Sequence, residues 1–327
     1  MSTAAEYLFF ADSMARGSSP LYEQLARGVA GDDEILGLLD GLPAPKRQPN
    51  LLLAAARLAG GVPRGFADFK ATVLGHADEV VATMLSRRTQ TNEAGRCAAL
   101  YPILAVLPQP LALIEVGASA GLCLLPDLYR YDYTAADGAT ATAGDPDSPV
   151  RLRCRVDGPA PRVGPGAVRV AWRAGIDLNP LDVTDEDDVN WLRALVWPEQ
   201  QERRERLDAA LTVARREPPR VVAGDLNERI DALVAEAPAD ATLVVFHTAV
   251  VDYVPEPARS AFVARMRGLD GHWLSQELPS VFPELAPRLP EEPPAGAVSY
   301  ALMLDERPLA YAALHGAWLR PFAGGLR

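Results

Sequence analysis

The sequence predicts an α/β protein in which an all-helical region precedes a mostly parallel sheet that closes with an antiparallel hairpin. Three observations support this prediction. Before residue 110, apolar residues recur at helical spacing and no convincing strand occurs. Beyond it, short apolar runs alternate with helical segments, which implies right-handed crossovers between parallel strands. Two adjacent strands then close the chain. We therefore expect a helical domain at residues 1–109 and an α/β domain at residues 110–327.

The helical region contains amphipathic segments separated by prolines. Helices are expected at residues 22–27, 34–39, 51–59, 66–87 and 92–107. Prolines 43, 45, 49 and 63 mark the turns between them, because proline interrupts a helix. We interpret this region as a cap or substrate domain.

The α/β region begins with the strand 111–116, a glycine-rich turn at 117–121 and a helical stretch from Leu122. Residues 131–167 are rich in Gly, Pro, Asp and Thr, and they are interpreted as an inserted hairpin or loop with one alternating strand at 150–156. Further strands are expected at 168–172, 220–223, 242–246, 272–277, 297–304 and 309–314, and helices at 185–216, 227–236 and 256–267. This alternation predicts a Rossmann-like sheet.

Composition restricts the partners of the protein. The 32 basic and 43 acidic residues give a formal charge of −11, and an acidic surface repels phosphate backbones, so no nucleic-acid partner is expected. No apolar stretch is long enough for a membrane span, and no leader segment is recognised, so we expect a cytoplasmic protein without a membrane partner. Neither the three cysteines nor the four histidines have metal-ligand spacing, and no metal site is expected.

The turn Gly117-Ala-Ser119-Ala-Gly121 fits two different chemistries. In the first, its backbone approaches an adenosyl cofactor, and Glu115 at the strand end orients a polar group of that ligand. In the second, it is a G-x-S-x-G elbow whose nucleophile is Ser119. A tight turn without a ligand is the third interpretation.

The elbow would need a base and an orienting carboxylate, for which His315 and Asp252 or Asp305 are candidates. The rest of the sequence favours the cofactor. Asp177 and Asp225 also follow strands, and ligands of open α/β sheets bind at the carboxyl ends of the strands. Asp at such a junction is also a common helix N-cap, which is the alternative for each residue alone.

The series of Glu115, the glycine turn, Asp177, Asp225 and the terminal hairpin resembles the class I S-adenosylmethionine-dependent methyltransferases. Ser119 stands in place of the middle glycine of their motif, and an insertion separates the first two strands. Nearly the whole chain resembles a bacterial family, domain of unknown function 2332. The residues that support this second resemblance are 91–97 (TNEAGRC), 113–122 (LIEVGASAGL), 175–182 (GIDLNPLD), 197–199 (WPE) and 246–251 (FHTAVV).

The methyltransferase resemblance implies a methyltransferase-type sheet, S-adenosylmethionine as cofactor, and a small-molecule acceptor beside the fourth and fifth strands. His247 and Glu277 end those strands and are candidate catalytic residues, His247 as a base. A buried, hydrogen-bonded His247 is the alternative. The cofactor would contact Glu115, Gly117, Ser119, Gly121, Asp177 and Asp225, and the substrate would contact Asn92, Glu93, Arg96, Asp252, Tyr253 and His315.

Each of those substrate residues also has a purely structural alternative. Glu93 and Arg96 lie at a spacing that allows an intrahelical ion pair, and Asp252 lies where it could cap a helix. The sequence thus predicts a methyltransferase that acts on a small molecule. A serine hydrolase built on Ser119 and a non-catalytic protein that binds an adenosyl ligand remain as alternatives.

Overall fold

The computed structural model describes residues 1–294 and 298–325, and these form two compact units. Met1–Thr91 and Asp185–Glu205 form unit 1, and Asn92–Thr184 and Arg206–Arg327 form unit 2. The compact units thus divide at Thr91, whereas the sequence-based domains divide at residue 110, and the segment 185–205 belongs with the N-terminal helices.

Unit 1 is built from helices, and side chains cap the first turns of some of them. Its helices are α1 (Thr3–Phe10), α2 (Pro20–Ala30), α3 (Asp33–Asp40), α4 (Pro49–Gly60), α5 (Phe66–Gly75), α6 (Ala77–Ser86) and α8 (Glu186–Leu195). Ser19 and Asp32 accept hydrogen bonds from the amides of Tyr22 and Ile35 and cap α2 and α3. The single helix expected at 66–87 is two helices, because the chain turns at His76.

Helix α8 belongs to unit 1 through side chains far apart in the sequence. The Trp191 indole donates to Arg88 O at 2.9 Å, and Arg87 pairs with Asp188. Just after the helix, the Trp197 indole donates to Asn50 Oδ1 at 3.1 Å. These contacts explain why a segment from the middle of the α/β region lies with the first helices.

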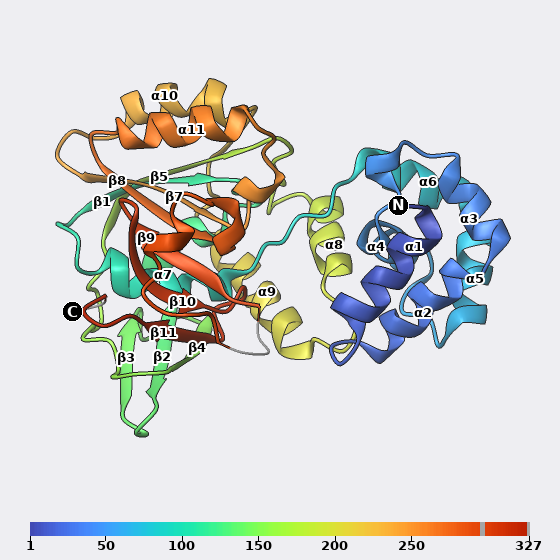
Figure 1. Ribbon diagram of the computed structural model, residues 1–327, viewed down its shortest axis with the longest axis horizontal. Coiled ribbons are helices and arrows are strands. Elements are labelled where there is room, and N and C mark those ends of the chain that lie inside the picture. Colours follow the sequence, from blue (N-terminus) through green and yellow to red (C-terminus); the bar gives the residue numbers. More distant parts are fainter. Residues whose placement is uncertain (295–297, 326–327) are drawn as a thin grey trace. The chain divides into compact units, whose positions relative to one another are not determined.

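Unit 2 is a mixed α/β structure around one sheet. In the described residues its strands are β1 (Leu111–Val116), β2 (Arg130–Ala135), β3 (Thr140–Gly144), β4 (Arg151–Val156), β5 (Val170–Asp177), β6 (Val221–Ala223), β7 (Thr242–Thr248), β8 (His272–Glu277), β9 (Tyr300–Leu304), β10 (Arg307–Ala312) and β11 (Trp318–Pro321). The order is β3-β2-β4-β11-β10-β9-β8-β7-β1-β5-β6 (Figure 1). Strands β6, β5, β1, β7 and β8 are parallel, and β9 and β10 form the expected antiparallel hairpin. Ala297, the expected start of β9, lies outside the described residues.

Helices α10 (Leu226–Glu236) and α11 (Ala258–Arg267) lie side by side on one face of the sheet (Figure 1). The core beneath them contains Ile114 and Val116 of β1, Trp273 of β8, and Phe262 of α11. Unit 2 also contains α7 (Cys97–Leu104), and the boundary between the units falls within α9 (Gln201–Ala214). Among the described helices, none is long and apolar enough to span a membrane.

The insertion at 131–167 differs from the expected hairpin or loop with one strand. It contributes β2, β3 and β4, which lengthen the sheet beyond β11. Alternate tyrosines of β2 fix its buried face: the Tyr131 ring lies 4.2 Å from that of Tyr101, and the Tyr133 hydroxyl donates to Ala98 O. Aromatic side chains at a period of two thus pack this segment against α7.

The helix expected from Leu122 is also wrong. The chain makes only the short 3-10 turns Leu122–Leu124 and Pro126–Leu128 before β2. Pro126 has no amide hydrogen to continue a helix, and Leu122 to Leu125 are all buried, so they present no polar face to solvent. The glycine turn is therefore not followed by a helix N-terminus.

Candidate functional site

The carboxyl ends of the parallel strands meet at one edge of the sheet in unit 2. Strand β1 lies between β5 and β7, with Glu115 beside Gly175 on one side and Phe246 on the other. After β1 the chain first forms β2, β3 and β4 beyond β11, and it then adds β5 and β6 on one side of β1 and β7 and β8 on the other. Such a reversal marks the place where open α/β sheets bind ligands.

The glycine turn at this edge is held by two side chains. Asp177 at the end of β5 accepts from the Ser119 amide at 2.8 Å and from the Asn179 amide at 2.8 Å. Asn92 donates to the Ser119 hydroxyl, and its carbonyl oxygen accepts from the Ala120 amide at 2.9 Å. The structure thus brings together Asn92, Ser119 and Asp177, three of the predicted residues.

Gly117 and Gly121 have backbone φ angles of 72° and 71°, in the region that favours glycine. A Cβ at Gly117 would lie 2.3 Å from the Val250 side chain, and one at Gly121 would lie 2.6 Å from Pro219. Both glycines are therefore explained by close packing within unit 2. Ser119 also has a positive φ, 52°, and its buried side chain makes this conformation stable through Asn92.

Asp225 follows β6 at the same edge, and its side chain caps α10. It accepts from the Asn227 amide at 2.8 Å, as expected for an N-cap residue.

His247 and Glu277 form a buried pair. The Glu277 Oε1 atom lies 2.7 Å from His247 Nδ1 and accepts from the amides of Val250 and Val251 at 2.9 and 3.1 Å. The Trp273 indole donates to His247 Nε2 at 2.9 Å. His247 is fully buried, so in this arrangement neither ring nitrogen is available to take a proton from a ligand. The pair instead holds the turn after β7.

The register of the strands separates the polar residues of this edge onto two faces, because side chains alternate along a strand. His247 aligns with Val116, and Glu277 with Ala301, and both partners belong to the core beneath α10 and α11. Thr248 pairs with Gln276 of β8, and Gln276 pairs with Leu302 of β9. Tyr300 lies two residues before Leu302 and so takes the same face. Glu115 aligns with Phe246, two residues from Thr248.

Glu115, Thr248, Gln276 and Tyr300 therefore share the opposite face of the sheet, and Arg96 reaches the same face. We call these five residues the polar face. Arg96 Nη1 donates to Thr248 O at 2.6 Å and to Thr248 Oγ1 at 2.9 Å. Sequence reasoning did not single out Thr248, Gln276 or Tyr300. A polar residue inside an otherwise apolar strand, as at Gln276, is the signal that could have found one of them.

The polar face contains buried polar atoms without protein partners. Among the described residues, Arg96 Nε, Glu115 Oε2 and Gln276 Oε1 are buried and accept or donate no hydrogen bond. Arg96 is 6% exposed, Glu115 is 4% exposed and Gln276 is fully buried. Since unpaired buried polar groups are rare and unfavourable, their convergence on one face indicates a place where a ligand completes the hydrogen bonding.

Burial raises the pKa of the Glu115 carboxyl well above its ordinary value, with a smaller effect in the same direction from Cys123. The Arg96 guanidinium acts in the opposite direction. Burial is the largest of these effects, and it disfavours the charged form of the Glu115 carboxyl.

The segment at 92–96 is not the helical face expected from sequence. Glu93 is extended and precedes the 3-10 turn Ala94–Arg96, and its Oε1 atom accepts from the Gly95 amide at 2.9 Å and from Arg206 Nε at 2.6 Å. The expected ion pair between Glu93 and Arg96 is not formed, because Arg206 takes the carboxylate and Arg96 turns to Thr248.

The His315–Gly316 turn lies against this segment. A Cβ on Gly316 would lie 1.8 Å from Gly95 O, and one on Gly95 would lie 2.5 Å from His315 O. His315 is half-buried there. Asp252 and Tyr253 lie in the 3-10 turn Val251–Tyr253 with exposed side chains, and Tyr253 is 84% exposed, so neither contacts His247.

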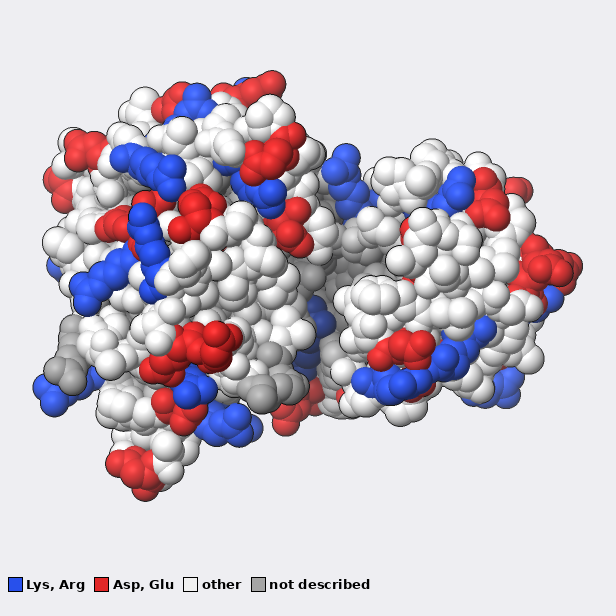
Figure 2. Space-filling view, in the orientation of Figure 1, with Lys and Arg blue, Asp and Glu red and all other residues white. Residues whose placement is uncertain are grey.

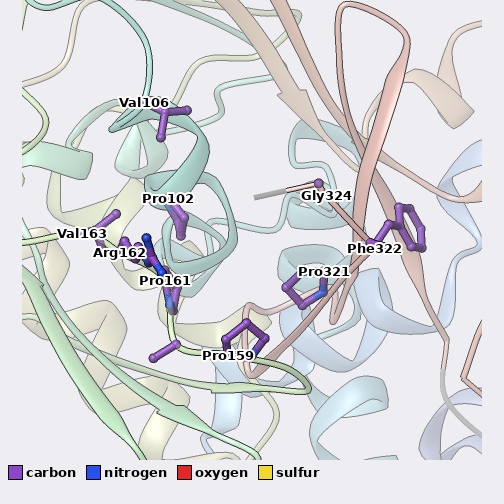
Figure 3. A pocket seen from close by; sticks show the side chains of 12 residues that line it. Pro102, Val106, Pro159, Pro161, Arg162, Val163, Pro321, Phe322 and Gly324 are labelled. Atoms are coloured by element: carbon purple, nitrogen blue, oxygen red, sulfur yellow. The ribbon is translucent and has the colours of Figure 1, made fainter. Parts of the chain in front are cut away.

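An apolar pocket of about 620 Å³ lies elsewhere in unit 2 (Figure 3). Its lining includes Pro102 of α7, Val106 after that helix, residues 159–163 of the insertion and Phe322 after β11. Among the described residues that line it, Arg162 is the one with a charge. None of the polar-face residues lines it, and we give more weight to the polar face because it holds the groups that chemistry requires.

On the face seen in Figure 2, acidic and basic side chains are interspersed on each unit. No group of three metal-ligating side chains occurs within residues 1–294 and 298–325.

Together, the fold and this edge define a mixed α/β protein with a candidate ligand site on the carboxyl ends of its parallel strands. The chain belongs to the family described as an uncharacterized protein conserved in bacteria (DUF2332), which it matches over residues 4–320. No curated protein and no solved structure gives a significant match to the chain.

Proposed function

We propose that this protein is an S-adenosylmethionine-dependent methyltransferase that acts on a small-molecule acceptor. The order β6-β5-β1-β7-β8 corresponds to 3-2-1-4-5 in a Rossmann-like sheet, which binds nucleotides at the reversal after the first strand. The observation that supports the proposal most is Glu115, a buried carboxyl with an unpaired Oε2 atom at that reversal, directly before the glycine turn.

The residues at this edge fit an adenosyl ligand in part. Glu115 offers an unpaired carboxyl oxygen, and Asp177 and Asp225 lie at the ends of the two neighbouring strands. Gly117 and Gly121 face protein atoms, so their role is to shape the turn that Asn92 and Asp177 hold. The cofactor would supply the electrophilic methyl group.

The contribution of the protein to the reaction is positioning. Two reactants held in a productive orientation gain much of the rate enhancement without a dedicated base. His247 and Glu277 act on the turn after β7 and leave Arg96, Gln276 and Tyr300 to contact the acceptor on the opposite face.

The serine hydrolase is supported less well. The positive φ of Ser119 is a feature of a strained nucleophile turn, but its hydroxyl accepts from Asn92, and within the described residues no histidine contacts it. A serine nucleophile needs a base within hydrogen-bond reach. If Ser119 is a nucleophile after all, a fluorophosphonate probe labels the wild-type protein and not the Ser119→Ala variant.

Titration calorimetry with S-adenosylhomocysteine tests the proposal. Micromolar binding, about −8 kcal/mol, is expected for the wild-type protein. Asp177→Ala and Glu115→Ala should weaken binding by about tenfold or more, because each loses hydrogen bonds to the ligand or to the turn. Asp231→Asn is the matched control, since its carboxylate is 68% exposed on α10 and pairs with Arg265. Absence of binding by a folded, monodisperse sample would refute the methyltransferase.

A further inference from the structure

The polar face contains a buried guanidinium without a counter-charge. Arg96 has only 6% of its surface exposed, and its two hydrogen bonds go to the neutral Thr248 oxygens from one nitrogen, Nη1. No carboxylate of the described chain lies within 4 Å of the guanidinium, and Nε is buried without an acceptor. A buried charge without a partner is strongly unfavourable, so this arrangement indicates a negative group supplied from outside the chain.

Three of the nearby acidic groups form other contacts, and Asp252, which acts on Tyr300, is exposed. Glu93 pairs with Arg206 and the Gly95 amide. Glu277 pairs with His247 on the other face of the sheet, and Asp177 holds the glycine turn. Burial raises the pKa of the Glu115 carboxyl, which disfavours its charged form. Arg96 therefore has its remaining fork, Nε and Nη2, free to bind an oxyanion in the planar geometry that guanidinium prefers.

Tyr300 provides a second donor on the same face. It is 8% exposed and begins β9, two residues before Leu302, the partner of Gln276. No described residue hydrogen-bonds its hydroxyl. Burial raises the pKa of the Tyr300 phenol, and Arg96 opposes this rise, so the phenol retains its proton at neutral pH and feels the guanidinium charge.

From this cluster we infer that the small-molecule acceptor is a carboxylic acid, whose carboxylate binds Arg96 and the Tyr300 hydroxyl beside Gln276. The identification of the ligand as the acceptor rests on the proposed function. The site over β7, β8 and β9 is separated by β1 from the ends of β5 and β6, where Asp177 and Asp225 lie. Several carboxyl groups surround the single guanidinium of Arg96, whose positive charge balances the one negative charge of a monoanion. A phosphate dianion would leave an unbalanced negative charge in a buried place.

Saturation-transfer NMR with benzoate tests the inference, and benzamide is the neutral probe of the same shape. We expect transfer to benzoate at millimolar concentration, little transfer to benzamide, and no displacement of benzoate by equal inorganic phosphate. Tyr300→Phe should weaken benzoate binding several-fold, and Arg96→Lys should weaken it by about tenfold or more, since it loses the planar fork. Tyr311→Phe is the matched control, because the Tyr311 ring belongs to the core on the opposite face.

Several results would overturn the inference: no benzoate signal with the folded wild-type protein, equal signals from benzoate and benzamide, displacement by equal phosphate, or unchanged binding in both variants. Tyr300→Phe keeps the aromatic ring and its packing, so this variant still tests the inference if Arg96→Lys does not fold. If Arg96→Lys weakens S-adenosylhomocysteine but not 5′-methylthioadenosine, the carboxylate belongs to the cofactor, and the inference is wrong. Benzoate binding without S-adenosylhomocysteine binding would instead refute only the proposed function.

Discussion

Replacement of Glu277 by alanine distinguishes a structural from a catalytic carboxylate. In the structure one oxygen of this side chain serves three donors, the amides of Val250 and Val251 and the His247 ring, at 2.9, 3.1 and 2.7 Å. Glu277 is 2% exposed and His247 is fully buried, so water cannot readily replace the lost acceptor.

Each buried donor left without a partner costs about 1–3 kcal/mol, which for three donors amounts to about 3–6 kcal/mol after partial relaxation. This is a large fraction of the stability of a typical domain, about 5–15 kcal/mol. Glu277→Gln retains a carbonyl acceptor and should lose about 1–2 kcal/mol, since only the charge-assisted part disappears.

Urea denaturation followed by tryptophan fluorescence measures this effect, because the Trp273 indole is bonded to His247 and reports on the same place. Glu228→Ala on the exposed face of α10 is the control, and a change within about 0.5 kcal/mol is expected there. A Glu277→Ala variant as stable as the Glu228→Ala variant would show that the three hydrogen bonds do not stabilise the turn, and the structural role would be wrong.

Three further predictions concern the neighbouring residues. The Glu115→Gln variant should become more stable relative to the wild-type protein as the pH rises above about 4.5. The carboxyl has a raised pKa in the folded state, so the folded protein binds a proton that the unfolded chain releases. The free energy of unfolding of the wild-type protein therefore falls by about 1.4 kcal/mol per pH unit until the folded carboxyl ionises. A pH-independent difference in urea titrations would contradict this sign. Asn92→Ala should destabilise by about 1–3 kcal/mol, since the Ser119 hydroxyl and the Ala120 amide both lose their partner, and faster amide exchange at Ala120 should accompany it; unchanged protection there would argue against the contact. A non-glycine residue in a left-handed conformation costs roughly 1–2 kcal/mol. Gly316→Ala should lower the stability by well over this amount, because its Cβ would lie 1.8 Å from Gly95 O. Gly138 has a similar φ angle and open space around it, so Gly138→Ala should show the conformational cost alone. If Gly316→Ala and Gly138→Ala lower the thermal stability equally, the turn at Gly316 does not pack against Gly95.

The sequence by itself predicted the mixed α/β class, the parallel strands and the terminal hairpin, because these depend on local periodicity. Apolar runs such as 111–116 and 242–248 are short, apolar and bounded by polar turns, which is the signature of buried parallel strands. It failed at Leu122, where four buried residues resemble a helix in composition but are fixed by contacts on all sides. It also failed to predict β2 and β3, which join the sheet through β4, the neighbour of β11.

For the candidate site, the sequence located the edge through strand ends, and Glu115, Asn92, Ser119 and Asp177 do lie there together. Only the tertiary structure decided which face of the sheet each polar residue takes, because a shift of one residue in register moves a side chain to the opposite face. His247 and Glu277 are therefore buried beneath α11, although each is the sequence neighbour of a polar-face residue, Thr248 or Gln276. Arg96 is far from Thr248 in the sequence but contacts it on the polar face. Long-range pairing of this kind leaves no periodic trace in the chain.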